Sequence, residues 1–160
     1  MKKLLLIACV LFTSTFAFAQ VEKGDINISG SLSFQKFSDM DGTGLLDTKV
    51  GYFFTQNLEA GANLTVIFSD PAGFGLGPYA TYNFLTQDAK LLPYAGANLL
   101  FFAMDGFNAT GLGVNGGAKY FLTETINIDA GLSLQKTFGD LDGSLFVMRV
   151  GIGFILGDLK

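Results

Sequence analysis

The sequence predicts an all-β protein: an eight-stranded antiparallel up-and-down transmembrane β-barrel. First, beyond residue 19 apolar and polar residues alternate with a period of two, which is typical of strands with two different faces. Second, the chain is 49% hydrophobic and has 21 glycines, yet no apolar run beyond residue 19 is long enough for a transmembrane helix. Third, turn-rich segments separate eight alternating stretches. A closed barrel is the β structure that satisfies its backbone inside a membrane.

Residues 1–19, MKKLLLIACVLFTSTFAFA, are predicted to be a secretory signal peptide. Two lysines precede an apolar run that ends in a small-x-small triplet, so cleavage is expected before Gln20. A lipoprotein cleavage box at LIAC (6–9) is the alternative, but the apolar run continues well beyond Cys9. We therefore expect one barrel domain over residues 20–160.

Composition excludes several classes of function. Without residues 1–19 the chain has no Cys, and the whole chain has no His. Disulfides, thiol chemistry and metal sites built on Cys or His are therefore excluded for the expected domain. Eight basic and fourteen acidic side chains remain, a net charge of −6, which argues against nucleic acid as a partner.

The expected strands have the length of transmembrane β-strands. A tilted strand needs about 9–11 residues to cross a bilayer, and each alternating stretch is that long or slightly longer. In INIDAGLSLQ (126–135), for example, Ile, Ala and Leu alternate with Asn, Asp, Gly, Ser and Gln. The strands are expected at roughly 25–37, 45–54, 58–69, 74–84, 91–103, 110–122, 126–136 and 145–156.

The segments between strands form two sets that alternate along the chain. One set is SDMDGTG, SDPAG, MDGFNA and TFGDLDGS, and the other is TQN, TQDAK and TET. An up-and-down barrel with both termini on one side has three turns on that side and four loops on the other. The two sets match this arrangement in number and in order.

A motif of Tyr, an aromatic or Leu, Thr and Gln or Glu recurs next to all three short turns. Its aromatic residues lie on the apolar face just before each turn, as expected for an aromatic belt at the membrane–water boundary. A generic hairpin signal is the alternative, but three copies at matching positions favour the belt. The belt residues on this side are Tyr52, Phe54, Tyr82, Phe84 and Tyr120.

The apolar face is expected to point outward. A soluble barrel would put it inside, but its many Phe and Tyr residues are too bulky for an eight-stranded lumen, which side chains just fill. The opposite face is small rather than charged, unlike a surface in water. Its glycines are Gly51, Gly61, Gly75, Gly77, Gly96, Gly111, Gly113, Gly117, Gly131, Gly151 and Gly153.

The charged residues of the strands are expected inside. None is placed on the apolar face, where a cation at the bilayer midplane would cost about 2–4 kcal/mol. A three-residue turn at 123–125 puts Lys119 directly across from Asp129, and a last loop centred near Asp140 puts Arg149 diagonal to Asp129. We therefore predict a lumen network centred on Asp129, because unpaired buried charges are costly. Its members are Asp47, Lys49, Glu59, Lys119, Asp129 and Arg149.

The chain resembles the small outer-membrane β-barrel family related to OmpA and OmpX, an outer membrane protein beta-barrel domain with a porin-like fold. The stretches KVGYFFTQNLEAG (49–61), LLPYAGANL (91–99) and AKYFLTETINIDAG (118–131) carry the resemblance. It implies a protein of the outer membrane of a diderm bacterium, with both termini periplasmic. It also implies a monomer surrounded by outer-membrane lipid.

The stretch RVGIGFIL (149–156) is similar to the signal that the barrel-assembly machinery reads during biogenesis of such barrels. The matching residues are Arg149, Gly151, Phe154 and Leu156. The alternative is a core strand with a glycine, which explains the alternation but not the spacing. The tail GDLK (157–160) departs from relatives that end on the aromatic strand.

No catalytic residue or cofactor is expected. Enzymes on small barrels of this membrane use His, which this chain lacks, so a His-based nucleophilic or acid–base site is impossible. A site built only on Asp47, Glu59 and Asp129 is conceivable, but structural pairing is the favoured interpretation. No metal is expected either. A weak Ca²⁺ candidate exists in DMDG (39–42) and DLDG (140–143), whose Asp-Gly pairs also make ordinary tight turns. The candidate ligands are Asp39, Asp41, Asp140 and Asp142.

The sequence therefore favours an integral outer-membrane barrel with a structural, envelope or surface-interaction role and a mostly filled lumen. The alternative is a narrow channel for small or hydrophobic solutes, which would need gaps between the lumen glycines. A soluble ligand-binding barrel is a third class.

Overall fold

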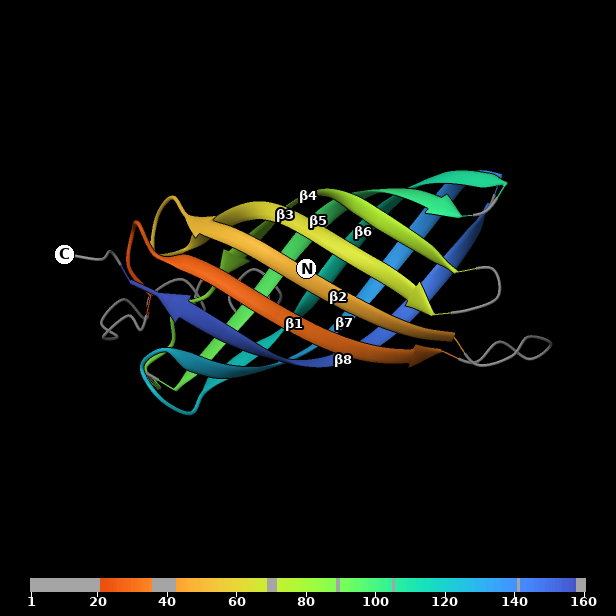
Figure 1. Cartoon of the computed structure of the whole chain (residues 1–160). Helices are drawn as coiled ribbons and strands as arrows, with labels where there is room; N and C mark the ends of the chain where they lie inside the picture. The colour runs from red at the N-terminus through yellow and green to blue at the C-terminus, as the bar shows by residue number, and fades with distance from the viewer. Residues whose placement is uncertain are drawn as a thin grey trace, which may run out of the picture.

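The chain forms one closed barrel in which each strand pairs antiparallel with the next and the last pairs with the first (Figure 1). The computed structural model describes residues 21–35, 43–68, 72–88, 90–104, 106–140 and 142–157. The predicted all-β, eight-stranded up-and-down fold is confirmed. No helix in these ranges is long and apolar enough to cross a membrane. The strands are β1 (Ile26–Gln35), β2 (Thr43–Phe53), β3 (Leu58–Phe68), β4 (Gly73–Asn83), β5 (Leu91–Met104), β6 (Phe107–Phe121), β7 (Ile126–Gly139) and β8 (Gly143–Leu156).

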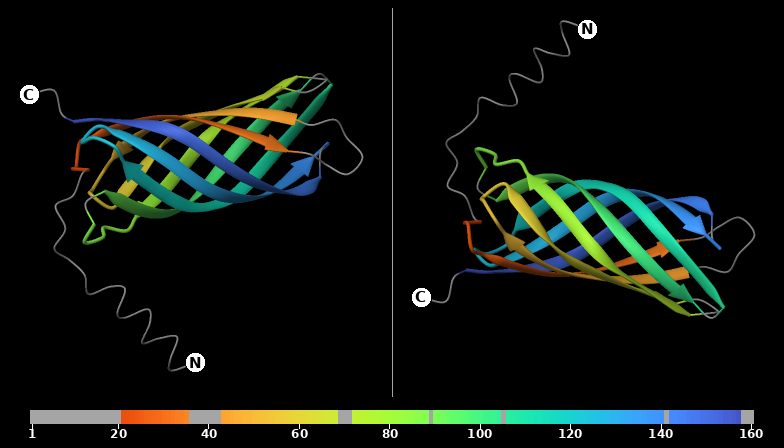
Figure 2. Two further views of the ribbon diagram at one scale, coloured as in Figure 1. Left: turned by 90° about the horizontal axis from the view of Figure 1, so that it is seen from below. Right: turned by 90° about the horizontal axis from the view of Figure 1, so that it is seen from above.

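The three short turns, the start of β1 and the end of β8 lie at one end of the barrel, which we call the terminal end. β1 begins there and β8 ends there, whereas the strand ends that the four other connections join lie at the opposite, loop end (Figures 1 and 2). The strands therefore run up and down between the two ends as the sequence predicts.

Threonine closes the terminal-end turns, which explains its place in the recurring motif. The hydroxyl of Thr55 accepts a hydrogen bond from the backbone N–H of Leu58 at 3.0 Å, and that of Thr123 accepts one from Ile126 at 3.0 Å. In the longer turn between β4 and β5 the hydroxyl of Thr86 instead donates to the carbonyl of Leu91 at 2.6 Å. The motif thus combines membrane-facing aromatics with a hydroxyl that ties the turn.

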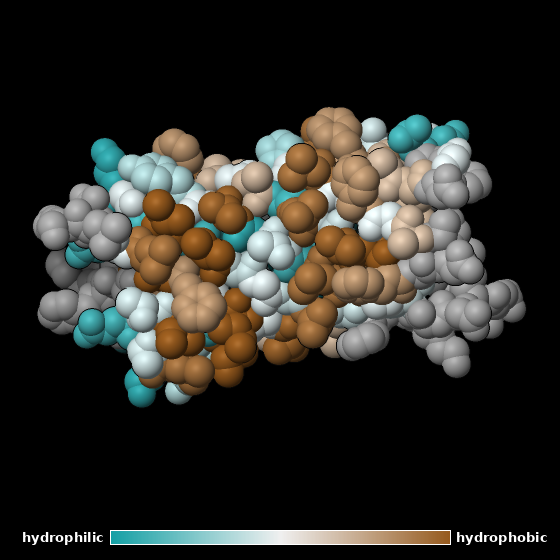
Figure 3. Space-filling view, viewed as in Figure 1, coloured by the Kyte–Doolittle hydropathy of each residue, from teal (hydrophilic) through white to brown (hydrophobic). Residues whose placement is uncertain are grey.

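The apolar faces of all eight strands point outward, so the soluble-barrel alternative is wrong. The side wall visible in Figure 3 carries patches of hydrophobic residues, and hydrophilic residues gather toward its ends. Large apolar side chains are left exposed to a degree that only a non-aqueous surrounding explains; Met148 and Val150 are 67% and 61% exposed.

β7 extends further toward the loop end than its predicted end at residue 136, and it carries one charge on its outer face. The β6–β7 pairing continues to Ala109 and Gly139, where Gly139 has a positive φ of 104°. Lys136, the last residue of the predicted strand 126–136, lies within β7 on the outward-facing parity, contrary to the expectation that no charged strand residue does so. Its ammonium pairs with Asp142 at 2.6 Å, and its side chain stays 48% exposed. The position near the loop end explains why a cation is tolerated.

Candidate functional site

The interior of the barrel is the candidate site, because the six predicted charged residues are all buried there together with polar neighbours. Each is 9% exposed or less. The six side chains come from five strands, and the alternation of the strands is what brings them to the common interior. The buried charged residues are Asp47 and Lys49 on β2, Glu59 on β3, Lys119 on β6, Asp129 on β7 and Arg149 on β8.

Glu59 is the most densely hydrogen-bonded carboxylate of the described interior. Its Oε2 accepts from the ammonium of Lys119 at 2.7 Å. Its Oε1 accepts from the hydroxyl of Tyr79 at 2.6 Å and from the amide Nδ2 of Asn27 at 2.7 Å. These four residues, which we call the polar layer, come from β1, β3, β4 and β6. Since β3 and β6 are not neighbours in the sheet, the Lys119–Glu59 ion pair spans the lumen.

The prediction that Asp129 is the centre of the network is wrong. The register does pair Lys119 directly with Asp129, as the three-residue turn implies. The lysine nevertheless binds Glu59 across the lumen, because its long stem carries the ammonium past its cross-strand neighbour. Asp129 instead accepts a hydrogen bond from the hydroxyl of Tyr94 at 2.6 Å.

Arg149 completes a second cluster beside Asp129. One of its terminal nitrogens, Nη2, lies 3.4 Å from both the hydroxyl of Tyr94 and the Oδ1 of Asn115. In the described structure the nearest hydrogen-bond partners of Arg149 are thus these neutral groups rather than a carboxylate. The diagonal register with Asp129 is present, since Arg149 pairs with Gly131.

The charges on β2 have neutral partners as well. The carboxylate of Asp47 accepts a hydrogen bond from the hydroxyl of Thr65 at 2.5 Å. The ammonium of Lys49 lies over the ring of Tyr79, 5.2 Å from its centroid, in cation–π geometry. Tyr79 therefore contacts both a cation and the carboxylate of Glu59.

Tyr79 and Tyr94 are lumen residues that the sequence analysis missed. Both lie on the same parity as the lumen glycines and asparagines of their strands, so the alternation alone contained the signal. The glycines make room for them. A Cβ added to Gly131 or Gly117 would come within 2.6 or 2.8 Å of the hydroxyl of Tyr94, closer than real Cβ contacts allow.

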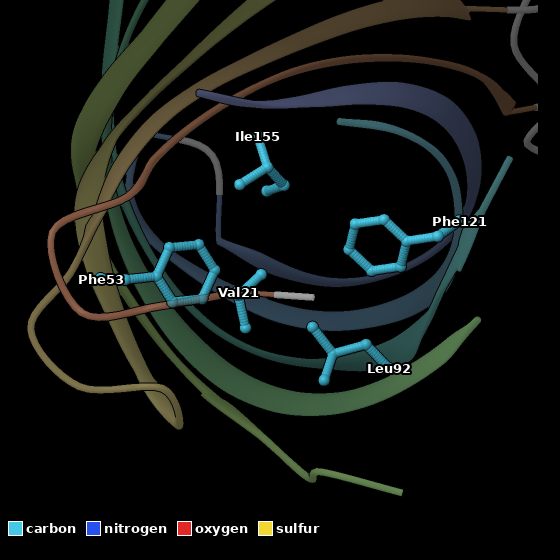
Figure 4. Packing of buried hydrophobic residues seen from close by; sticks show 5 residues of the cluster. All are labelled: Val21, Phe53, Leu92, Phe121 and Ile155. Atoms are coloured by element: carbon cyan, nitrogen blue, oxygen red, sulfur yellow. The ribbon is translucent and has the colours of Figure 1, made fainter. Parts of the chain in front are cut away.

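A second group missed from the sequence closes the terminal end of the lumen. Four apolar side chains on the inward parity of β2, β5, β6 and β8 surround Val21, which precedes β1 (Figure 4). Lys119 joins the two layers, because its ammonium lies 5.4 Å from the centroid of the Phe53 ring. We call this group the apolar layer; it comprises Val21 (0% exposed), Phe53 (0%), Leu92 (6%), Phe121 (2%) and Ile155 (3%).

The predicted belt residues lie on the outer surface near the terminal end. Tyr52 packs edge-on against Phe54 at a centroid distance of 5.1 Å, and Tyr82 packs in the same way against Phe84 at 5.2 Å. A further set of outward aromatics lies toward the loop end and contains only phenylalanine. The belt residues are Tyr52, Phe54, Tyr82, Phe84 and Tyr120, and the further set is Phe68, Phe74, Phe101, Phe138 and Phe146.

The residues of the predicted assembly signal lie on both faces of β8. Arg149 points into the lumen, whereas Phe154 and Leu156 are exposed on the outer face. Gly151 lies against β1, where a Cβ would come within 2.6 Å of the Cβ of Ser31. The role of this stretch as an assembly signal stays a prediction.

The weak Ca²⁺ candidate is only partly visible. Asp39 and Asp41 lie outside the described residues. The carboxylate of Asp140 accepts a hydrogen bond from the backbone N–H of Asn108 at 3.0 Å, and Asp142 pairs with Lys136. Within the described ranges no three Asp, Glu, Cys or His side chains are grouped to hold a metal ion.

Several solved β-barrel structures share the fold of this chain. The N-terminal β-barrel domain of Pseudomonas aeruginosa OprF is 22% identical, with a TM-score of 0.68 over 85% of this chain and 100% of that domain. Neisserial surface protein A is 19% identical, with a TM-score of 0.63 over 83% of this chain and 97% of that one. OprG of P. aeruginosa is 13% identical, with a TM-score of 0.60 over 86% and 99%. At these identities the likeness establishes the fold.

No curated protein sequence matches the chain significantly. The family is established by the sequence profile of the outer membrane protein beta-barrel domain, which matches residues 5–154. The resemblance to the small OmpA- and OmpX-related barrels is thereby confirmed. The chain belongs to the outer membrane protein beta-barrel domain family of bacterial outer-membrane barrels.

Proposed function

We propose that the protein is a structural or surface-interacting component of the bacterial envelope, with a lumen closed to solutes and both termini on the periplasmic side. The observation that carries this proposal is the Lys119–Glu59 ion pair, which crosses the lumen and is 2.7 Å long. A solute that passes along the axis must separate two buried opposite charges, at a free-energy cost of several kcal/mol.

The apolar layer supports the same conclusion independently. Phe53 and Phe121 are 0% and 2% exposed, so close-packed rings occupy the terminal end of the lumen. An ion would have to enter a region without polar partners. A filled lumen suits a protein whose role lies in its contacts with lipid and with molecules at the surface.

The engagement of the carboxylates argues for a non-enzymatic role. Glu59 and Asp129 bind Lys119 and Tyr94 respectively, and Asp47 binds Thr65. General acid–base chemistry needs a carboxyl group within reach of a substrate. These three carboxylates instead accept hydrogen bonds from neighbouring lumen side chains, so structural pairing is the role that their geometry supports.

Single-channel recording in planar bilayers tests the proposal. The purified, heat-modifiable barrel is expected to show no steady conductance. The matched variant is Glu59→Gln together with Lys119→Met, which removes the ion pair while keeping similar side-chain volume. A steady conductance of the unaltered protein would overturn the proposal and support the alternative, a narrow channel for small or hydrophobic solutes.

A further inference from the structure

An open, mainly apolar hollow lies on the outer wall of the barrel, over the neighbouring strands β6, β7 and β8 (Figure 1). Its volume of about 750 Å³ lies within the range of roughly 300–1,000 Å³ that is typical of small-molecule sites. Small outward-facing residues of β6 and β7 form its floor, and larger outward-facing residues of β7 and β8 stand beside them. The floor residues are Gly116, Ala118 and Ala130, and the larger residues are Leu132, Met148 and Val150.

The hollow lies between the two sets of outward aromatic residues. On β6, Tyr120 of the belt lies on the terminal-end side of Ala118. On β8, Phe146 lies on the loop-end side of Met148. The outer surface of a barrel between two such aromatic sets faces the hydrocarbon of the membrane. An acyl chain of a lipid is therefore the occupant whose chemistry fits the hollow at this depth.

Lys136 lies on the same strand as Ala130, nearer the loop end. Among the described strand residues it is the only charged one on the outward-facing parity. Its ammonium lies 5.9 Å from the centroid of the Phe138 ring and donates to Asp142 at 2.6 Å. Both partners of this ion pair are exposed, so the pair itself contributes little. An ammonium has three donors, and Ser144, directly across from Lys136 on β8, adds an exposed hydroxyl.

The separation between the hollow and Lys136 matches the depth of one leaflet. Ala130 and Lys136 are six positions apart, which is about 20 Å along a strand. A strand tilt of about 45° reduces this to about 14 Å along the membrane normal, close to half of a hydrocarbon core of about 30 Å. A lipid whose headgroup lies at Lys136 therefore places its acyl chain at the hollow.

We propose that the outer wall over β6, β7 and β8 binds a membrane lipid with a phosphate in its headgroup. The phosphate oxygens accept hydrogen bonds from the ammonium of Lys136 and the hydroxyl of Ser144, and an acyl chain of the same lipid occupies the hollow. The cation selects the phosphate, and the hollow holds the chain. This inference goes beyond the proposed function, because it concerns the outer wall and does not depend on whether the lumen conducts.

Native mass spectrometry of the purified barrel, released from detergent with dipalmitoyl phosphatidylglycerol present, tests this lipid site. Lys136→Gln removes the cation and Ala130→Phe fills the hollow, so each is expected to lower the affinity for this lipid about fivefold. Asp142→Asn is expected to raise the affinity, because it frees a donor of the ammonium. Dipalmitoylglycerol has the same chains without the phosphate and is expected to bind more weakly than phosphatidylglycerol.

Each of the two weakening variants has a matched control. Lys90→Gln removes an exposed lysine from the turn between β4 and β5, and Ala97→Phe adds the same ring at an exposed outward position of β5. Both are expected to bind the lipid as the unaltered protein does, and heat modifiability on a gel checks that each variant is folded. Equal binding within either matched pair, or equal binding of dipalmitoylglycerol and phosphatidylglycerol, would overturn the lipid site. Conductance of the unaltered protein bears only on the proposed function, so the two can fail separately.

Discussion

The polar layer and the apolar layer close the same lumen by different physical means. The polar layer depends on matched partners: an ammonium, a phenol hydroxyl and an amide N–H all donate to one buried carboxylate. The apolar layer depends on shape, because its five side chains are removed from water without any hydrogen bond. In the polar layer, deletion of one side chain leaves its partner buried without a hydrogen bond, which lowers stability strongly. In the apolar layer, the loss of stability depends only on the atoms removed and the cavity that they leave.

The largest effect is expected from Glu59→Ala. It leaves the ammonium of Lys119 buried without its carboxylate, so the free energy of unfolding should fall by about 3–5 kcal/mol. Reversible denaturant unfolding in detergent or lipid vesicles measures it. The double variant Glu59→Ala with Lys119→Met should recover most of the loss, since no charge is then stranded. If Glu59→Ala alone lowers the free energy of unfolding by less than about 1 kcal/mol, water hydrogen-bonds the ammonium of Lys119 as well as Glu59 does.

Ile155→Ala probes the apolar layer and is expected to lower the free energy of unfolding by about 2–4 kcal/mol. Ile155 is 3% exposed, so its removed atoms leave a cavity against Phe53 and Phe121. The same unfolding measurement applies. In the polar layer a second substitution is expected to restore stability. In the apolar layer no second truncation should restore the stability that Ile155→Ala loses. Recovery on removing a neighbouring side chain would contradict the distinction between the layers.

Gly131→Ala is expected to have the smallest of the three effects, about 1–3 kcal/mol. Its Cβ would lie 2.6 Å from the hydroxyl of Tyr94, which must then move away from Asp129. Gly30→Ala is the matched control, because a Cβ there meets nothing within 4 Å. Equal stability of the two variants in denaturant would mean that the position of the Tyr94 side chain does not contribute to stability.

Much of the fold could be predicted from the period of two and from the turns. The alternation identified all eight strands, and the three-residue turn gave the register of Lys119 with Asp129. The ion pair between Lys119 and Glu59 could not be predicted in this way. It depends on which side chains meet across the lumen, and that is set by strand tilt and stagger rather than by cross-strand neighbours.

The residues at the terminal end were harder to predict for a different reason. Phe53, Phe121 and Ile155 alternate with outward aromatics and leucines, so these strand ends are apolar on both faces. Val21 lies outside any alternating stretch, and a pattern that describes strands contains no information about it. Lys136 is the last residue of the predicted strand 126–136 and lies on its apolar parity, so the alternation already contained this outward charge.

The β1–β8 ladder joins Ile26–Leu32 to Val150–Leu156, the parts of the barrel that are furthest apart in sequence. Every other ladder joins strands that follow one another along the chain. Formation of this seam requires closure of a loop of more than a hundred residues, whose entropy must be overcome before the seam's hydrogen bonds contribute. Until then β1 and β8 are open edges that can pair with another chain. Folding speed and the risk of aggregation are thus decided at one seam, and Gly151, which lets β8 approach β1 closely, lies within it.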